Sequence, residues 1–120
     1  MEKLKVKANL KYRAYYFSLN IIDFLETLPK SYIYQTIGGQ LLRSATSVGA
    51  NIVEAQAGRT KKDFTNFYQI SLKSANETKY WLAILREKLK EKKIVELLLK
   101  EADEISKMLG ASIITLKAKS

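Results

Sequence analysis

Four polar side chains recur at helical spacing near the middle of the sequence. Arg43, Ser47, Asn51 and Glu54 are separated by steps of four, four and three residues, so a helix places them on one face. Such a row can form a hydrogen-bonded seam against a neighbouring helix or subunit. Alternatively, it can recognise a partner or nucleic acid. Catalysis is the weakest interpretation, because Glu54 has no second carboxylate or nucleophile in a recognisable arrangement.

Two clusters of basic residues suggest phosphate binding. Arg59, Lys61 and Lys62 stand at an expected helix–helix turn, where the N–H groups of the next helix also attract anions. A denser cluster, interspersed with two glutamates, consists of Arg86, Lys88, Lys90, Lys92 and Lys93. The alternative for both clusters is that they are simply solvated helix ends.

A basic arm of about residues 1–9 opens the chain, and Arg13 lies just beyond it. Aromatic residues follow closely, namely Tyr12, Tyr15, Tyr16 and Phe17. Basic residues interleaved with aromatic rings can bind single-stranded RNA by charge attraction and base stacking. Aromatic residues at helical spacing more often pack in a core or a subunit contact, which is the competing interpretation.

Two absent residue types exclude whole classes of site. Without cysteine there is no disulfide, thiolate nucleophile or cysteine-based zinc site. Without histidine there is no imidazole ligand, Ser-His-Asp triad or Glu-x-x-His di-iron motif. We therefore expect a non-enzymatic protein with no catalytic residue, metal or cofactor. The sequence shows neither a signal peptide nor an apolar stretch of membrane-spanning length, which predicts a cytoplasmic protein with no membrane partner.

The composition is typical of one folded domain over residues 1–120. Hydrophobic residues make up 47% of the chain. Its 21 lysines and arginines exceed its 12 aspartates and glutamates, which gives a net charge of +9. This excess favours an acidic partner such as nucleic acid, although it can also serve only solubility.

Apolar residues recur at intervals of three and four, which predicts helices that must position these groups. The first helix should begin near Asn9 or Leu10 and end at Pro29. The second should begin within residues 31–40 and close at Gly58 in the left-handed conformation. The expected core positions are Leu10, Ala14, Phe17, Ile21, Phe24 or Leu25, and Leu28 in the first helix, and Ile37, Leu41, Ala45, Val48, Ile52 and Ala55 in the second.

A third helix should follow Thr60, whose hydroxyl caps it, with Asp63 at the third helical position. A tight turn within residues 89–93 should separate it from a fourth helix, because continuing the same stripe would bury lysine and glutamate. The expected core positions are Phe64, Phe67, Ser71, Ala75, Thr78, Leu82, Leu85 and Leu89 in the third helix, and Ile94, Leu98, Ala102, Ile105, Leu109 and Leu116 in the fourth.

Small residues dominate the second helix and face small residues on the third. If these two helices form a hairpin, Ser47 should lie opposite about Ser71, and Arg43 opposite about Ala75. The two backbones can then approach closely. A leucine in place of Ala45 or Gly49 should therefore overpack the seam and destabilise the protein by about 1–3 kcal/mol or more.

One segment, "QLLRSATSVGANIVEAQAGRTKKDFTNFYQISLKSANE", resembles bacterial proteins often encoded by intervening sequences in 23S ribosomal RNA genes. The resemblance extends from "KYRAYYFSLNIIDF" to "SKMLGASIITL". Its most specific part is the pattern formed by Arg43, Ala45, Ser47, Asn51, Ile52 and Glu54, followed by Arg59, Lys61, Lys62 and Phe64. Two positions depart from the family pattern: Gly49 stands where proline is common, and Ala55 where glycine is common.

The resemblance implies an all-α, antiparallel, up-down-up-down four-helix bundle that assembles as a homopentamer. The similar accessory protein of diversity-generating retroelements is a basic pentameric barrel that engages nucleic acid and a reverse transcriptase. Apolar residues outside the core stripes would supply the subunit contact, namely Tyr16, Ile22, Leu42 and Trp81. We therefore expect a self-assembling protein that binds nucleic acid, RNA rather than DNA. Ribosomal RNA or its intervening segment is the first candidate. The alternatives are an assembly or protein-interaction module without nucleic-acid binding and, more weakly, a protein that associates with a membrane surface through its basic arm.

Overall fold

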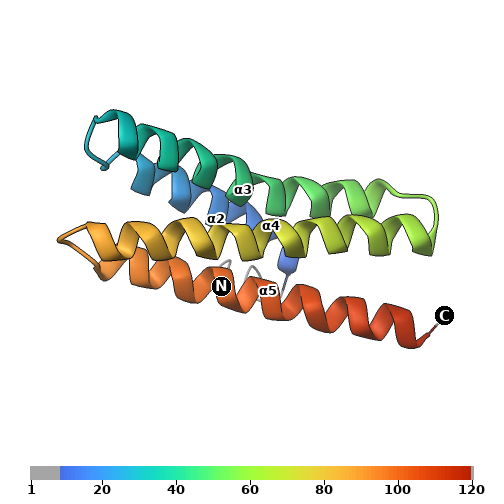
Figure 1. Cartoon of the computed structure of the whole chain (residues 1–120). Helices are drawn as coiled ribbons and strands as arrows, with labels where there is room; N and C mark the ends of the chain where they lie inside the picture. The colour runs from blue at the N-terminus through green and yellow to red at the C-terminus, as the bar shows by residue number, and fades with distance from the viewer. Residues whose placement is uncertain (1–8, 120) are drawn as a thin grey trace.

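The computed structural model describes residues 9–119, and these form four α-helices without a β-strand (Figure 1). In chain order the helices are α2 (Leu10–Leu25), α3 (Tyr32–Ala57), α4 (Lys61–Lys88) and α5 (Lys93–Ala118). The predicted number of helices and the all-α class are therefore confirmed.

Side-chain caps fix the starts of three helices, and the sequence predicted one of them, at Thr60. The Asn9 side chain accepts a hydrogen bond from the N–H of Lys11 at 3.0 Å, and Ser31 caps α3 in the same way. The end of α2 differs from the prediction, because the helix stops at Leu25 rather than at Pro29. The intervening residues leave the helix through tighter turns that bond three residues back, such as Leu28 N–H to the Leu25 carbonyl at 3.2 Å.

Gly58 ends α3 in a different way from the one expected. Its φ of −67° and ψ of 150° are extended, so the predicted left-handed closure is wrong. A side chain at Gly58 would place its Cβ 3.1 Å from the Ala55 carbonyl oxygen and 3.2 Å from the Asp63 Cβ. The glycine therefore provides space in a crowded turn. The cap that follows is confirmed, because Thr60 Oγ1 accepts the N–H of Asp63 at 3.0 Å.

The turn between α4 and α5 lies within residues 89–93, as predicted. Its distinctive feature is Lys92, whose ammonium group donates to the carbonyl of Leu89 at 2.9 Å and also to that of Arg86. These carbonyls belong to the end of α4, where helix carbonyls lack partners and carry partial negative charge. Lys92 therefore acts as a helix cap.

The helices alternate in direction around a closed ring (Figure 1). Along α3, Ser44 meets Thr78 and Val48 meets Ser71, so α3 and α4 run antiparallel. Each helix packs against its neighbours in sequence, and α2 also packs against α5. Within residues 9–119 the diagonal pairs, α2 with α4 and α3 with α5, make no close backbone contact.

One helix is much shorter than the others. α2 has 16 residues, whereas α3, α4 and α5 have 26, 28 and 26. Figure 1 shows that α2 begins part-way along the bundle and continues towards the α2–α3 turn. The opposite end, where α3 ends, α4 begins and α5 ends, is therefore built by three of the described helices.

The core follows the predicted stripes, but seven predicted positions are only partly buried, namely Leu10, Leu28, Ile37, Phe64, Phe67, Leu89 and Leu116. Phe24 is buried, and Leu25 only partly. At the start of α5 the buried residue is Val95, and the predicted Ile94 is exposed. Tyr68 and Ile113 also join the core. Further along α5, the predicted Leu98, Ala102, Ile105 and Leu109 are buried.

Candidate nucleic-acid interface

Hydroxyl groups join α3 to α4 along their shared face. Thr78 Oγ1 lies 3.0 Å from Ser44 Oγ, and Ser74 Oγ lies 2.9 Å from Ser47 Oγ. Ser71 donates to the Val48 carbonyl at 2.8 Å. The predicted seam of small residues is present, with a register shift of nearly one turn, since Ser47 meets Ser74 instead of Ser71.

The four-residue polar row divides between this seam and the surface. Asn51 donates to the carbonyl and hydroxyl oxygens of Ser47, at 2.8 and 2.9 Å, so it supports the seam. Arg43 forms an ion pair with Glu77 on α4, at the exposed edge. Glu54 is exposed and lies outside these hydrogen bonds, which corrects its assignment to the seam.

Glu77 is also held by the indole of Trp81, whose Nε1 donates to Glu77 Oε2 at 2.9 Å. This hydrogen bond, together with Arg43, holds the pKa of Glu77 below its usual value. The group is thus a charged tie between α3 and α4. Trp81, expected on the assembly surface, is instead partly buried against the core.

Gly49 does not belong to the α3–α4 seam, contrary to expectation. A Cβ placed at Gly49 would lie 3.5 Å from the Cβ of Ala14 on α2. Gly49 therefore allows α2 and α3 to approach each other, and its side of α3 faces away from the hydroxyl seam.

The Arg13 side chain is largely buried and pairs with carboxylates of α5. Its guanidinium contacts the Glu101 carboxylate at 2.7 and 2.9 Å, a carboxylate oxygen of Glu104, and Met108 Sδ at 3.4 Å. Only 16% of the Arg13 side chain is exposed. The hydrogen bonds that Arg13 donates to the Glu101 carboxylate are the largest cause that raises the pKa of Arg13 above its usual value. Arg13 therefore does not belong to the exposed basic surface on which the sequence analysis placed it.

The two basic clusters lie at opposite ends of the bundle. Arg59, Lys61 and Lys62 are exposed around the α3–α4 turn, whereas the other cluster surrounds the α4–α5 turn (Figure 1). In the second cluster Arg86 lies 3.3 Å from Glu87 and 4.0 Å from Glu96, and Lys92 caps α4. The exposed cations left there are Lys88, Lys90 and Lys93.

Two lysines outside the predicted clusters join the first of them. Lys117 and Lys119 are exposed at the end of α5, which lies at the same end of the bundle as the α3–α4 turn (Figure 1). The signal was available, because in an antiparallel four-helix bundle the last helix ends beside the second turn. The lysines of the basic arm, Lys3, Lys5 and Lys7, lie outside the described residues.

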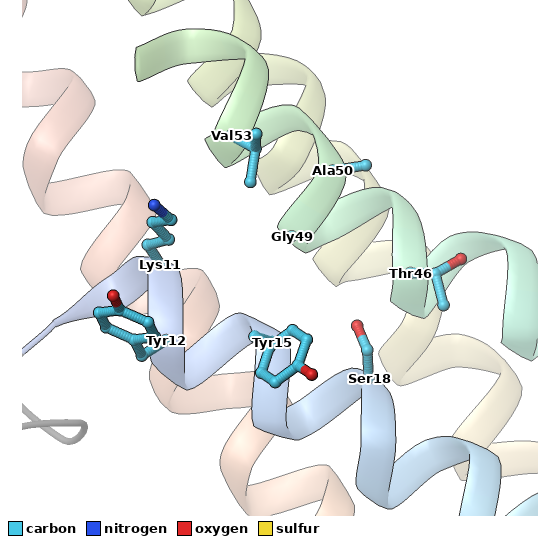
Figure 2. Close-up of a pocket in the computed structure, with 8 residues that line it drawn as sticks. All are labelled: Lys11, Tyr12, Tyr15, Ser18, Thr46, Gly49, Ala50 and Val53. Atoms are coloured by element: carbon cyan, nitrogen blue, oxygen red, sulfur yellow. The ribbon is translucent and has the colours of Figure 1, made fainter. Parts of the chain in front are cut away.

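A shallow hollow of about 330 Å³ lies on the surface between α2 and α3 (Figure 2). Tyr12 and Tyr15 border it, with exposed fractions of 48% and 55%, and Gly49 and Val53 form its α3 side. Lys11 Nζ lies 5.6 Å from the centre of the Tyr12 ring. The exposed apolar surface continues along α2 through Tyr16, Leu19 and Ile22.

Metal-binding clusters and membrane-spanning helices are both absent from residues 9–119. No group of three or more aspartates and glutamates in this range lies close enough together to hold a metal ion. Every helix in the same range is too short or too polar to cross a bilayer.

Comparisons with known proteins agree on one family. The family model described as 23S rRNA-intervening sequence protein matches residues 7–111. A similar solved structure is a protein of unknown function from the S23 ribosomal protein family of Bacteroides thetaiotaomicron. It shares 33% sequence identity and superimposes with a TM-score of 0.80, covering 88% of this chain and 98% of its own. Among curated proteins there is no match.

Proposed function

The chain belongs to the family of 23S rRNA-intervening sequence proteins, and on that basis we propose a non-enzymatic protein that binds RNA through its basic helix ends. The observation that carries this proposal is the group of exposed cations at those ends. Arg59, Lys61, Lys62, Lys88 and Lys90 form no ion pair with any residue from 9 to 119. Free cations of this kind attract a phosphate backbone and release counterions on contact.

RNA is favoured over DNA by the family's own description, which associates these proteins with ribosomal RNA. Ribosomal RNA or its intervening segment is therefore the first ligand to test. An RNA-binding role would also fit the cytoplasmic location that the sequence predicts.

We further propose that the protein assembles with copies of itself, five of them by family resemblance. The support is the exposed apolar surface of α2, which includes Tyr15, Tyr16, Leu19 and Ile22, with Leu42 exposed on α3. Patches of this kind on a small protein usually mark an interaction site. In a ring, the basic ends of all copies would form a larger cationic surface.

The rival function is an assembly or protein-interaction module whose positive charge serves only solubility. The same apolar surface supports it. Both hypotheses predict assembly, and only the first predicts affinity for RNA.

The decisive measurement is binding to labelled 23S ribosomal RNA fragments across a salt series. An acidic protein of similar size is the control. If RNA is bound through phosphates, the affinity should fall with salt, with a log–log slope of about −0.7 for each contact on a single strand. Absence of affinity at low salt would leave the interaction-module hypothesis. Sedimentation at micromolar concentration tests assembly separately, because a 13.7 kDa monomer would contradict the ring.

A further inference from the structure

Among residues 9–119, the short α2 does not extend over the last part of one α5 face. Arg13, in the first turn of α2, contacts Glu101, Glu104 and Met108 on this face. Residues that follow at helical spacing on the same face are Ala111, Ser112 and Thr115. Because α2 begins only at Leu10, none of its residues extends over them.

A hollow of about 370 Å³ occupies this position, between the start of α4 and the end of α5. It is lined by Phe64, Tyr68, Ala111, Ser112, Thr115 and Leu116. The Phe64 and Tyr68 rings lie with their centres 4.5 Å apart and an interplanar angle of 30°. Tyr68 is 7% exposed and Phe64 is partly exposed, so Phe64 presents aromatic surface to the hollow.

Exposed cations flank this hollow along both helices. Lys61 and Lys62 lie in the α4 turn that leads to Phe64, and Lys117 directly follows Leu116 on α5. Lys119 and Arg59 extend the same end surface. None of the five forms an ion pair with any residue from 9 to 119. Within residues 9–119, the exposed carboxylates on the adjoining turns are those of Asp63 and Glu54.

From this juxtaposition we propose that this end of the bundle binds single-stranded RNA, with one unstacked base in the hollow and the adjoining phosphates on the surrounding cations. The proposal rests on the RNA-binding function proposed above and assigns it to one end. Aromatic side chains stack on bases of any sequence, and Lys and Arg bind the backbone. The hydroxyls of Ser112 and Thr115 can hydrogen-bond the edge of the base.

Charge argues against the other occupants of the hollow. Residues 1–8 of the chain carry Lys3, Lys5 and Lys7 against Glu2 alone, so they would add positive charge to a positive surface. A second copy seated end to end would likewise bring like charges together. A polyanion with exposed bases complements both the charge and the aromatic lining.

Two matched variants locate the phosphate-binding cations. The first, K61Q/K62Q/K117Q/K119Q, removes four exposed charges at this end. The second, K30Q/K88Q/K90Q/K93Q, removes four exposed charges at the opposite end. Glutamine retains helix propensity, so both should keep their helicity and assembly. The probe is a fluorescein-labelled 12-nucleotide oligouridylate. The first variant should flatten the salt slope by about 0.7 for each phosphate that it no longer neutralises, and it should flatten the slope more than the second variant does.

A third variant tests the base pocket. Ala111→Leu places a larger, non-aromatic side chain at an exposed helical position that lines the hollow, where it should fill space without disturbing the core or adding a ring that stacks on bases. It should weaken oligouridylate binding about 5-fold or more, the lower range for removal of one stacked base. Affinity for a 12-base-pair RNA duplex, which offers no unstacked base, should remain the same. Phe64→Leu is the second route, because it keeps an apolar residue and removes the aromatic ring.

Photo-crosslinking of the unmodified protein to a 4-thiouridine oligonucleotide places the base directly. Crosslinks should fall in the tryptic peptides 63–73 and 108–117, which contain the residues of the hollow. Crosslinks confined to other peptides, or a larger drop in affinity in the opposite-end variant, would overturn this assignment and leave the RNA-binding function intact. If the unmodified protein binds neither the oligouridylate nor the RNA duplex, the proposed RNA-binding function itself is contradicted.

Discussion

Thr78 on α4 lies 3.0 Å from the hydroxyl oxygen of Ser44 on α3, and both residues are fully buried. Two hydroxyls stand where a bundle of this type would normally place leucines. The Ser44 hydroxyl also lies 3.2 Å from the Leu41 carbonyl oxygen, and the Thr78 hydroxyl 2.7 Å from that of Ser74, so each has a partner whichever donates across the seam. The close approach of α3 and α4 therefore depends on small side chains whose polar atoms satisfy one another.

Thr78→Val should destabilise the protein by about 0.5–1.5 kcal/mol, because it keeps the volume of threonine and removes the hydrogen bond to Ser44. Thr78→Leu should cost more, at about 1–3 kcal/mol, because the seam has no room for the larger side chain. Urea unfolding followed by circular dichroism measures both. A leucine variant as stable as the wild type would mean that the seam is not closely packed.

Arg13→Met should lower the free energy of unfolding by about 1–3 kcal/mol, since it removes the guanidinium that contacts both the Glu101 and the Glu104 carboxylate. The triple variant R13M/E101Q/E104Q removes the charges on both sides and should recover most of this stability. The same series predicts unchanged RNA affinity in low salt for every folded variant. Weaker RNA binding specific to the Arg13 change would restore this residue to the binding surface.

Gly49→Ala should stabilise the protein by about 0.5–1 kcal/mol. Alanine favours the helix interior over glycine, and its Cβ would meet the Cβ of Ala14 at an ordinary contact distance of 3.5 Å. Gly39→Ala is the matched control, since nothing lies within 4 Å of its added Cβ. Thermal unfolding should rank the two variants together above the wild type. A lower melting temperature for Gly49→Ala alone would contradict this prediction, because it would mean that α2 and α3 pack too closely to accept the added methyl group.

The fluorescence of Trp81, the single tryptophan, should titrate with Glu77 in acid. Hydrogen bonding to Trp81 and pairing with Arg43 lower the pKa of Glu77 from its usual 4.5. The stabilisation is therefore complete above pH 4.5 and is lost as the pH falls through the lower, folded-state pKa. Emission at constant helicity should change with a midpoint below 4.5, and Glu77→Gln should abolish the change. A midpoint above 4.5 would contradict the hydrogen-bond arrangement.

Hydrophobic periodicity predicted the four helices because each buries one stripe, and the cap at Thr60 followed from local chemistry. The caps at Asn9 and Ser31 were not predicted. Gly58 was misinterpreted because glycine suits both a left-handed residue and a crowded turn, and sequence alone does not distinguish them. The prediction that Ile94 is buried failed because Ile94 and Val95 are adjacent apolar residues, and periodicity alone does not decide which of them faces the core.

The candidate site was harder to predict than the fold. Arg13 belongs to a basic segment in the sequence, yet its carboxylate partners lie 88 and 91 residues away and only the closed bundle brings them together. For the same reason Lys117 and Lys119 joined the surface around Arg59 without any nearby motif. A cluster of basic residues in the sequence does not by itself predict a basic surface, because the surface depends on which helix ends meet in the folded bundle.

The order of the helices around the ring also bears on how the chain folds. Every contact between described helices joins sequence neighbours, except that of α2 with α5. Local hairpins lose little loop-closure entropy, whereas the Arg13–Glu101 contact must close a separation of 88 residues. We therefore expect the hairpins between sequence neighbours to form in the folding transition state and α2 to dock on α5 afterwards. A late-docking α2 means that replacing Arg13 accelerates unfolding and leaves the refolding rate nearly unchanged.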